Sequence, residues 1–266
     1  VYTFNEYPDK RHTRITNQSE KAFIMDKEKI DYLYFEEFEK VRNFSPENFV
    51  KKILIEKLNA KKVLCGFNFT FGKGKSGNPE ILKEILEKNR IELEIQEAVF
   101  DDNLEVISST NIRKHIKETN LEKVKKLLGH NLIILGKVIH GKQLGRTIGF
   151  PTANLKFENR VYPSFGVYGV KIYFYEKGIL KTYTGVMNIG RNPTVDKDNL
   201  SVETHIFDFD KDIYGKYILI EIFKNIRKEI KFNSIDELKN QIDKDSKYWK
   251  NEVKKIKEQD RENKIR

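Results

Sequence analysis

The sequence predicts an α/β domain followed by an all-β domain that ends in a long helix. From residue 1 to about residue 129, short apolar runs alternate with helical stretches, which is typical of a parallel sheet. Beyond that point, apolar residues recur at every second position, which favours antiparallel strands arranged as a small barrel. We therefore expect one domain at residues 1–129 and a second at residues 130–266.

Two helix starts mark the α/β half. Ser45 and Asn78 each precede a proline, and a capping side chain followed by proline at the first helical position is a common helix beginning. The helix after Ser45 carries an apolar stripe made of Phe49, Val50, Ile53, Leu54 and Leu58. Strands are expected after the two helices, at residues 62–66 and 91–100, and the alternating order predicts parallel pairing.

The all-β half shows its period of two in three segments. Each segment places alternate side chains on one face, and these are Val170, Ile172 and Phe174, then Val202, Thr204 and Ile206, then Ile218, Ile220 and Ile222. A final helix is predicted from about Ser234, because Ser234 and Glu237 have the spacing of a capping box. Its buried face is expected to consist of Ile235, Leu238, Ile242, Trp249, Val253 and Ile256.

Composition limits the classes of protein that the chain can belong to. A formal charge of +10 favours anionic partners such as nucleotides, nucleic acid or acidic lipid, although solvated lysine-rich surfaces explain it equally well. Cys65 is the single cysteine, which excludes an intramolecular disulfide or a thiolate metal cluster and fits a reducing cytoplasm. The sequence shows neither an apolar run of about 18 residues nor a signal peptide, so we expect a cytoplasmic protein that does not bind membranes.

The stretch from His140 to Asn154 holds the clearest chemical signal. It carries three glycines at four-residue intervals and two cations, which are Gly141, Gly145, Gly149, Lys142 and Arg146. Glycine lets backbone amides approach an anion and the cations offset phosphate charge, so the pattern favours a phosphate cradle. It lacks the Gly-Lys-Ser/Thr of a Walker loop, and a barrel corner or β-bulge would need the same glycines.

Oxygen ligands follow directly after the glycines. Pro151 precedes Thr152, and the Thr152 hydroxyl and the Asn154 amide lie two residues apart, hence on one face of an extended segment. Two neutral oxygens suit Mg²⁺ that arrives with ATP, because this ion keeps its waters and phosphate oxygens and needs few protein ligands.

Four motifs of the second half occur in a specific order. They are Gly-Arg-Thr-Ile-Gly-Phe-Pro-Thr-Ala-Asn (145–154), Pro-Ser-Phe-Gly-Val-Tyr-Gly (163–169), Gly-Val-Met-Asn-Ile-Gly-Arg-Asn-Pro-Thr (185–194) and Val-Glu-Thr-His-Ile-Phe-Asp-Phe (202–209). Together they resemble the riboflavin kinase module of bacterial bifunctional FAD synthetases. The resemblance implies a Greek-key β-barrel that transfers the γ-phosphate of ATP to riboflavin, with riboflavin and FMN as substrate and product.

The resemblance also implies roles for single residues. Thr152 and Asn154 would meet the Mg²⁺ of MgATP, and Glu203 would accept the proton of the flavin hydroxyl. The phosphate-binding set would be Gly141, Lys142, Gly145, Arg146, Thr147, Gly149, Pro151 and Asn188. Glu203 could instead be an ordinary solvated strand carboxylate, and His205 fits a structural partner better than a catalyst. Arg191 is displaced from the family's Gly-x-Arg-Pro-Thr pattern, which weakens any role for it.

The first half resembles the nucleotidyltransferase domain of the same family, which is Rossmann-like and adenylates FMN to FAD. Gly-Phe-Asn-Phe-Thr-Phe-Gly (66–72) resembles the family's Gly-x-Asp-Phe-x-Phe-Gly flavin-side loop and implicates Asn68, Phe71 and Gly72, with Asn68 in place of the usual aspartate. Ser-Ser-Thr-Asn-Ile-Arg (108–113) resembles a helix start that holds ATP phosphates and implicates Ser108, Ser109, Thr110 and Arg113. A simple N-cap is the alternative for this second motif.

Two departures concern the adenylation chemistry. The family's His-x-Gly-His stretch has no counterpart among the five histidines here and would lie upstream of Val1. The family's Thr-Phe-x-Pro-His-Pro is represented by Thr-Phe-Asn-Glu-Tyr-Pro (3–8), which lacks the histidine. We expect residues to precede Val1 in the native protein, which would then have both activities; otherwise the first domain is a remnant or a regulatory lid.

Two rival hypotheses stay open from the sequence alone. A basic β-barrel with 12 tyrosines and 18 phenylalanines could bind nucleic acid through stacking and charge. A transferase whose barrel has no catalytic role would form FAD from FMN without phosphorylating riboflavin. The kinase hypothesis predicts small-molecule partners only, namely riboflavin, FMN and ATP.

Overall fold

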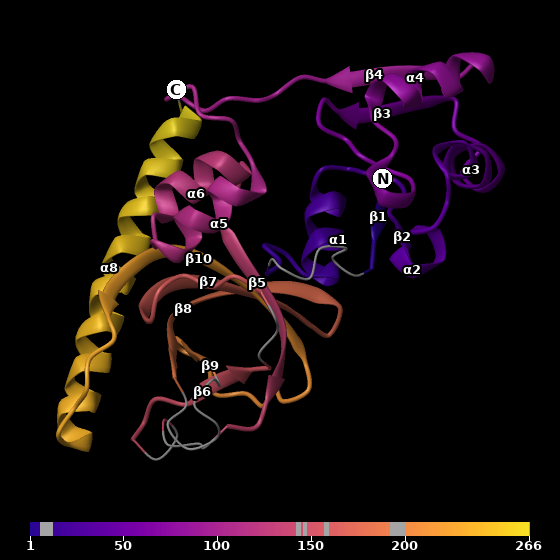
Figure 1. Cartoon of the computed structure of the whole chain (residues 1–266). Helices are drawn as coiled ribbons and strands as arrows, with labels where there is room; N and C mark the ends of the chain where they lie inside the picture. The colour runs from indigo at the N-terminus through magenta and orange to yellow at the C-terminus, as the bar shows by residue number, and fades with distance from the viewer. Residues whose placement is uncertain (6–12, 142–144, 146–147, 157–159, 192–199, 266) are drawn as a thin grey trace. The chain divides into compact units, whose positions relative to one another are not determined.

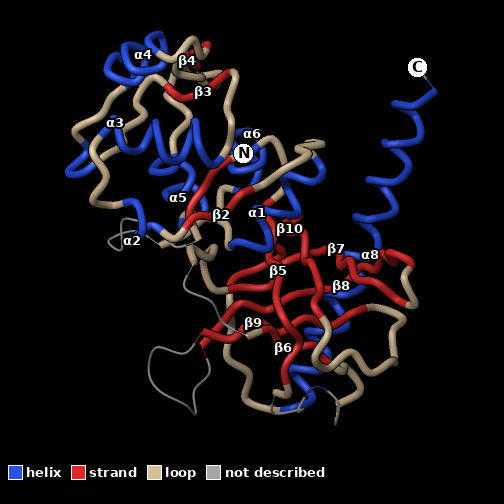
Figure 2. The backbone as a smooth tube through the Cα atoms, turned by 90° about the vertical axis from the view of Figure 1, so that its right-hand side faces the viewer, coloured by secondary structure: helices blue, strands red, loops and turns tan. Residues whose placement is uncertain are grey.

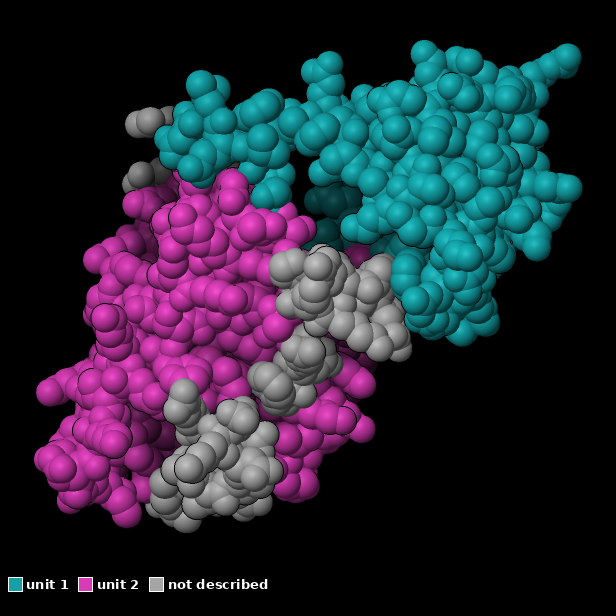
Figure 3. All heavy atoms as spheres, in the orientation of Figure 1, with its two compact units in different colours: residues 1–12, 22–108 teal, residues 13–21, 109–266 magenta. Residues whose placement is uncertain are grey.

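The chain divides into two compact units (Figure 3). The computed structural model describes residues 1–5, 13–141, 145, 148–156, 160–191 and 200–265. Unit 1 comprises residues 1–12 and 22–108, and unit 2 comprises residues 13–21 and 109–266. Helices α5 (Ser109–Lys117) and α6 (Leu121–Leu128) thus group with the second half, and the domain boundary expected near residue 129 stays a prediction.

Unit 1 contains two small parallel sheets. Strand β1 (Tyr2–Phe4) pairs with β2 (Tyr34–Glu36), and β3 (Lys62–Gly66) pairs with β4 (Glu92–Gln96). The predicted parallel pairing is confirmed, although over the described residues it forms two separate strand pairs. The strand expected at residues 91–100 ends at Gln96, because its partner strand ends at Gly66, the register partner of Gln96.

The helices of unit 1 begin where the caps predict. The Ser45 hydroxyl accepts the Asn48 N–H at 3.2 Å, and the Asn78 side chain accepts the Ile81 N–H at 2.9 Å. The helical elements of the first half are α1 (Gln18–Lys27), α2 (Phe38–Val41), α3 (Pro46–Phe49), η1 (Val50–Lys57), η2 (Lys73–Lys75) and α4 (Pro79–Lys88). Most of the predicted apolar stripe is buried, but Leu58 is 37% exposed, because it caps the end of the wide π-helical element η1.

Unit 2 is built on a closed antiparallel barrel (Figures 1 and 2). Its strands are β5 (Leu132–Ile139), β6 (Thr152–Leu155), β7 (Gly166–Glu176), β8 (Ile179–Arg191), β9 (Leu200–Ile206) and β10 (Tyr217–Lys228). Around the barrel they follow the order β10-β5-β6-β9-β8-β7. Strand β8 pairs antiparallel with both β7 and β9, and β9 pairs with β6, which is a Greek-key strand order.

The predicted inward face of the barrel is confirmed. All nine residues of the three period-two sets are buried, from Val170 at 0% exposed to Ile206 at 4% exposed. Their neighbours Glu203 and His205 point to the outer face, because side chains alternate along a strand. Any ligand that reaches Glu203 must therefore bind outside the barrel wall.

Helix α8 (Ile235–Ile265) lies beside β8 along the outside of the barrel (Figure 1). The Ser234 hydroxyl accepts the Glu237 N–H at 3.1 Å, so the predicted cap is present. Trp249 is 1% exposed and donates its indole N–H to the Val170 carbonyl at 3.1 Å. Ile235 was expected to be buried and is 56% exposed, because it lies in the first turn, before the helix meets its packing partners.

A segment from early in the chain packs into unit 2. Glu20 and Arg160 form an ion pair in which both side chains are at most 2% exposed. Glu20 also accepts the Leu135 N–H at 2.8 Å, which attaches α1 to β5. Arg160 donates to the Ile15 carbonyl at 2.7 Å. In the part of the chain that the structure describes, no helix is both long and apolar enough to cross a membrane.

Candidate active site

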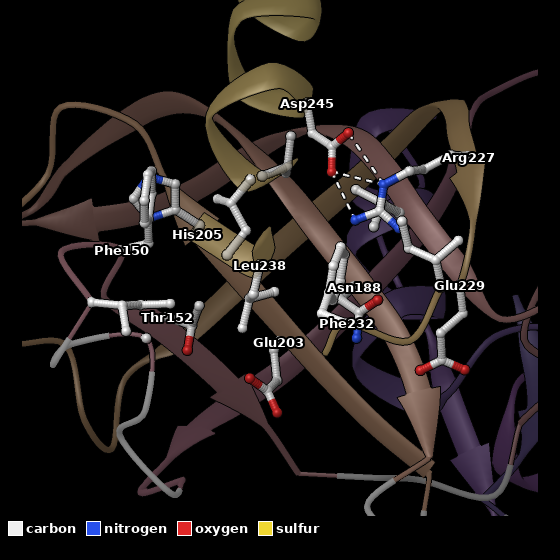
Figure 4. Close-up of a pocket in the computed structure, with 16 residues that line it drawn as sticks. Phe150, Thr152, Asn188, Glu203, His205, Arg227, Glu229, Phe232, Leu238 and Asp245 are labelled. Atoms are coloured by element: carbon white, nitrogen blue, oxygen red, sulfur yellow. Dashed lines mark hydrogen bonds and ion pairs between the residues drawn. The ribbon is translucent and has the colours of Figure 1, made fainter. Parts of the chain in front are cut away.

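A cavity of about 250 Å³ lies between the outer face of the barrel and α8 (Figure 4). Strands β6, β8, β9 and β10 supply most of its polar residues, and α8 supplies the apolar Leu238 and Ile242 together with Asp245. The lining residues are Gly145, Ile148, Phe150, Thr152, Val167, Val186, Asn188, Glu203, His205, Arg227, Glu229, Ile230, Phe232, Leu238, Ile242 and Asp245. Predicted site residues from separate motifs thus meet in one place.

Three of the predicted polar residues are neighbours across adjacent strands. Glu203 on β9 is the register partner of Asn154 on β6 and of Asn188 on β8. Register partners in an antiparallel sheet lie on the same face with close Cβ atoms, so all three side chains share the outer face. The Ser201 hydroxyl donates to Glu203 Oε1 at 2.9 Å, which orients the carboxylate.

The glycine-rich stretch lies against these residues. A methyl group on Gly141 would lie 2.3 Å from Nδ2 of Asn154, and one on Gly145 would lie 2.3 Å from the Phe150 carbonyl oxygen. Glycine at these two positions lets the backbone come this close to the Asn154 side chain and to the Phe150 carbonyl. Gly149 has a positive φ of 87° and open space around it. Lys142, Arg146 and Thr147 lie outside the described residues, so the phosphate cradle stays a prediction.

His205 is half-buried and is the register partner of Thr152. Its Nδ1 lies 3.0 Å from the Pro151 carbonyl oxygen, so this nitrogen donates a hydrogen bond in the neutral ring. The ring also meets the Phe150 ring edge to face at 5.2 Å between centroids. Burial lowers the pKa of His205 from its ordinary value. These contacts favour the structural role that the sequence suggested.

An ion pair that the sequence did not predict joins the barrel to α8. The Arg227 guanidinium on β10 contacts the Asp245 carboxylate on α8 at 2.8 Å and 2.9 Å (Figure 4). Asp245 also accepts the Gln241 side-chain N–H at 2.8 Å. Leu238, Ile242 and Asp245 share one helix face by their spacing, and this was the signal available in the sequence. The pair holds the apolar wall of the cavity in place.

A second cavity of about 420 Å³ shares the lining residue Thr152 with the first. Strand β6 and the loop between β9 and β10 form most of its wall. The lining residues are Val138, Pro151, Thr152, Ala153, Ile206, Phe209, Asp210, Lys211, Asp212, Ile213 and Tyr214. The second cavity is therefore lined partly by inward-facing residues of the barrel such as Ile206, and Thr152 lies in the wall of both cavities.

The predicted adenylation residues of unit 1 lie near the ends of its elements. Asn68 is exposed in the turn after β3, and Phe71 is 7% exposed and stacks on Phe69. Gly72 has a φ of 74°, and a methyl group there would lie 3.1 Å from the Pro46 ring. Ser108 also belongs to unit 1.

The remaining adenylation candidates belong to unit 2. Ser109 and Thr110 form the exposed first turn of α5. Arg113, one turn later, donates from Nε to the Thr13 carbonyl at 2.8 Å. The exposed helix start agrees with an anion site and equally with a plain N-terminus, so the assignment of these residues stays a prediction.

Comparisons with known proteins cover both halves of the chain. A family model described as riboflavin kinase matches residues 128–253, and one described as FAD synthetase matches residues 1–111. The chain is 38% identical over 245 residues to a bifunctional riboflavin kinase/FMN adenylyltransferase of Buchnera aphidicola, covering 91% of this chain and 76% of the relative. It is 35% identical to the Escherichia coli protein of the same description over 238 residues, which are 89% of this chain and 75% of that protein.

One solved structure is similar to this chain over most of its length. A crystal structure from Streptococcus pneumoniae, described as a macrolide-efflux protein, is 34% identical with a TM-score of 0.75. The match covers 92% of this chain and 81% of that one. These relationships lend no support to the nucleic-acid-binding alternative.

Proposed function

This chain belongs to the family of bifunctional riboflavin kinase/FMN adenylyltransferases, and on that basis we propose that the outer face of its barrel phosphorylates riboflavin with ATP to give FMN. The observation that carries the proposal is the cross-strand grouping of Asn154, Glu203 and Asn188 beside Thr152. Thr152 lines both cavities, Glu203 and Asn188 line the smaller one, and Asn154 lines neither. A phosphotransferase needs an acceptor alcohol and a nucleotide in adjoining spaces with a carboxylate near the acceptor.

The flavin occupies the smaller cavity in this proposal. Its wall offers Ile148, Val186, Phe232, Leu238 and Ile242, and apolar walls with a few polar groups suit a flat aromatic ring system. The nucleotide occupies the larger cavity, whose wall includes the predicted phosphate-binding residue Pro151. Thr152 then lies between the two substrates.

Glu203 acts on the acceptor alcohol. Its carboxylate takes the proton of the terminal ribityl hydroxyl, whose oxygen forms a bond to the γ-phosphorus of ATP. The bond from this phosphorus to the β,γ-bridging oxygen breaks, and ADP leaves with the electron pair. The Ser201 hydroxyl, 2.9 Å from Glu203 Oε1, keeps the carboxylate oriented towards the acceptor.

The residues present fit a magnesium ion carried by the nucleotide. The Thr152 hydroxyl and the Asn154 amide provide hard oxygen donors on one face of β6. When bound, the ion neutralises charge on the phosphate oxygens. The protein's own contribution is to position these two donors beside Glu203.

For the first half of the chain we propose the next step of FAD biosynthesis, which is the adenylation of FMN. The residues proposed for it are Asn68, Phe71, Gly72, Ser108, Ser109, Thr110 and Arg113. A cytoplasmic location also stays a prediction. The decisive experiment incubates the protein with riboflavin and MgATP and separates FMN from FAD by chromatography. FMN formation supports the kinase proposal, whereas FAD formed from added FMN without riboflavin phosphorylation would contradict it.

A further inference from the structure

The loop between β9 and β10 forms one wall of the larger cavity. Phe209, Lys211, Ile213 and Tyr214 of this loop line the space. Backbone hydrogen bonds of 2.9 Å fix the two ends of the loop, from the Phe207 N–H to the Thr184 carbonyl and from the Gly215 N–H to the Val138 carbonyl. The middle of the loop has no strand pairing, so side-chain contacts must set its position. If these side-chain contacts are lost, the loop shifts and the shape of the cavity changes.

Aromatic rings attach this loop to the far end of the β7–β8 hairpin. The Phe209 ring lies edge to face with Phe174 at 5.6 Å and with Tyr183 at 5.1 Å between centroids. Phe174 and Tyr183 stack on each other at 5.2 Å. Such edge-to-face pairs stabilise one relative position of the rings beyond the gain from their burial. The hairpin thus presents a preformed aromatic platform to the loop.

A carboxylate on the same hairpin completes the attachment. Glu176 accepts the Tyr183 hydroxyl at 3.0 Å through Oε1 and the Lys211 ammonium at 2.9 Å through Oε2. The Lys211 ammonium lowers the pKa of the Glu176 carboxyl below its ordinary value. Lys211 is 60% exposed, and the ion pair alone contributes little. Its effect is to select the position in which Phe209 meets the platform.

From these contacts we infer that Glu176 and Tyr183 are positioning residues for the nucleotide. Neither lines the larger cavity, and both act through the loop that does. The inference rests on the proposed function, which places the nucleotide in this cavity. The inference gives the β7–β8 hairpin a role in ATP affinity. The hairpin lies far along the chain from the glycine-rich stretch, so the sequence alone does not suggest this role.

Steady-state kinetics with each substrate varied in turn test the inference. For Glu176→Gln and Tyr183→Phe we expect the KM for ATP to rise about threefold to tenfold, as loss of one hydrogen bond predicts. The KM for riboflavin and kcat should stay within twofold of the parent protein. Glu252→Gln is the control, because Glu252 also accepts from two side chains, here Lys224 and Lys255, but lies on α8 and outside the lining of the larger cavity.

The outcomes separate the inference from the proposed function. An unchanged KM for ATP in both variants would overturn the inference, even if their melting temperatures fell, because the residues would then be merely structural. A rise in the KM for riboflavin in place of that for ATP would instead overturn the placement of the two substrates. A similar rise in the Glu252→Gln control would also count against the inference, because it would show that any lost ion pair has this effect.

Discussion

Asn154 on β6 and Glu203 on β9 are direct register partners on the outer face of the barrel. Neighbouring strands lie about 4.8 Å apart, so a group bound by the amide is within reach of the carboxylate without any rearrangement of the backbone. Sheet register is among the most rigid features of a fold, since a slip by one residue turns every side chain to the opposite face. The site is therefore preorganised by strand pairing.

Replacing Glu203 by glutamine should abolish most turnover while leaving nucleotide binding intact. The amide keeps the shape and the Ser201 contact but no longer accepts a proton, and a positioned general base contributes about 10²–10⁴ in rate. Rapid-quench assays of FMN formation and titration with an ATP analogue measure the two effects. Glu221→Gln, on the outer face of β10, is the control, and normal activity of the Glu203 variant would refute the assigned base.

Alanine at Gly141 should cost activity by displacing Asn154. The new methyl group would lie only 2.3 Å from the Asn154 amide. The Asn154 side chain can relieve this overlap only by moving away from Glu203. Displacement by about 1 Å at a reacting centre lowers rates by about a hundredfold. Gly136→Ala on β5 is the control, because its methyl group would meet Leu155 at an ordinary 3.4 Å. Equal activity of the two variants would contradict this reasoning.

Asparagine at Asp245 should destabilise unit 2. It leaves the Arg227 guanidinium, whose side chain is 19% exposed, without its charged partner, and breaking a buried ion pair in this way costs about 3 kcal/mol. Chemical denaturation measures the free energy of unfolding. Lys224→Gln, which breaks the exposed pair with Glu252 on the same helix, should change it by less than about 0.5 kcal/mol. Similar losses in both variants would show that burial of the pair does not matter.

The stability of the parent protein should fall in alkali through Tyr168. This side chain is fully buried, donates its hydroxyl proton to the Ser164 carbonyl, and has a pKa that burial raises above its ordinary value of 10.0. Above about pH 10 the unfolded chain loses the phenolic proton and the folded chain keeps it, so unfolding is favoured as pH rises. Tyr168→Phe should be about 1 kcal/mol less stable at pH 7, through the lost hydrogen bond, and less sensitive to alkali. Unfolding curves of the parent protein and the variant are measured at pH 7 and at pH 10.5. If the difference between their free energies of unfolding were the same at both pH values, this expectation would be wrong.

Local patterns predicted much of this fold because they depend on near neighbours along the chain. The caps at Ser45 and Asn78 and the buried faces of β7, β9 and β10 follow from spacing alone. The same spacing placed Thr152 and Asn154 on one face of β6. The motif resemblance then joined them to Glu203, whose strand pairs directly with theirs.

Features that depend on distant partners could not be predicted in the same way. Arg227 and Asp245 meet because α8 turns back along the barrel, and neither residue shows in its own segment which charge it will face. The position of the cavity on the outer wall also required knowing that α8 covers that face. Ile235 failed as a core residue for the related reason that amphipathic spacing does not show where packing begins.

The ion pair of Glu20 and Arg160 has a practical consequence for dissecting this enzyme. The carboxylate comes from the opening portion of the polypeptide, whereas the guanidinium belongs to the barrel half, 140 positions further on. A truncated gene that starts at β5 would encode a barrel with an orphaned cation in its interior. Anyone who expresses the kinase portion separately should graft residues 13–21 back onto it, because no single cut through the sequence yields both halves intact.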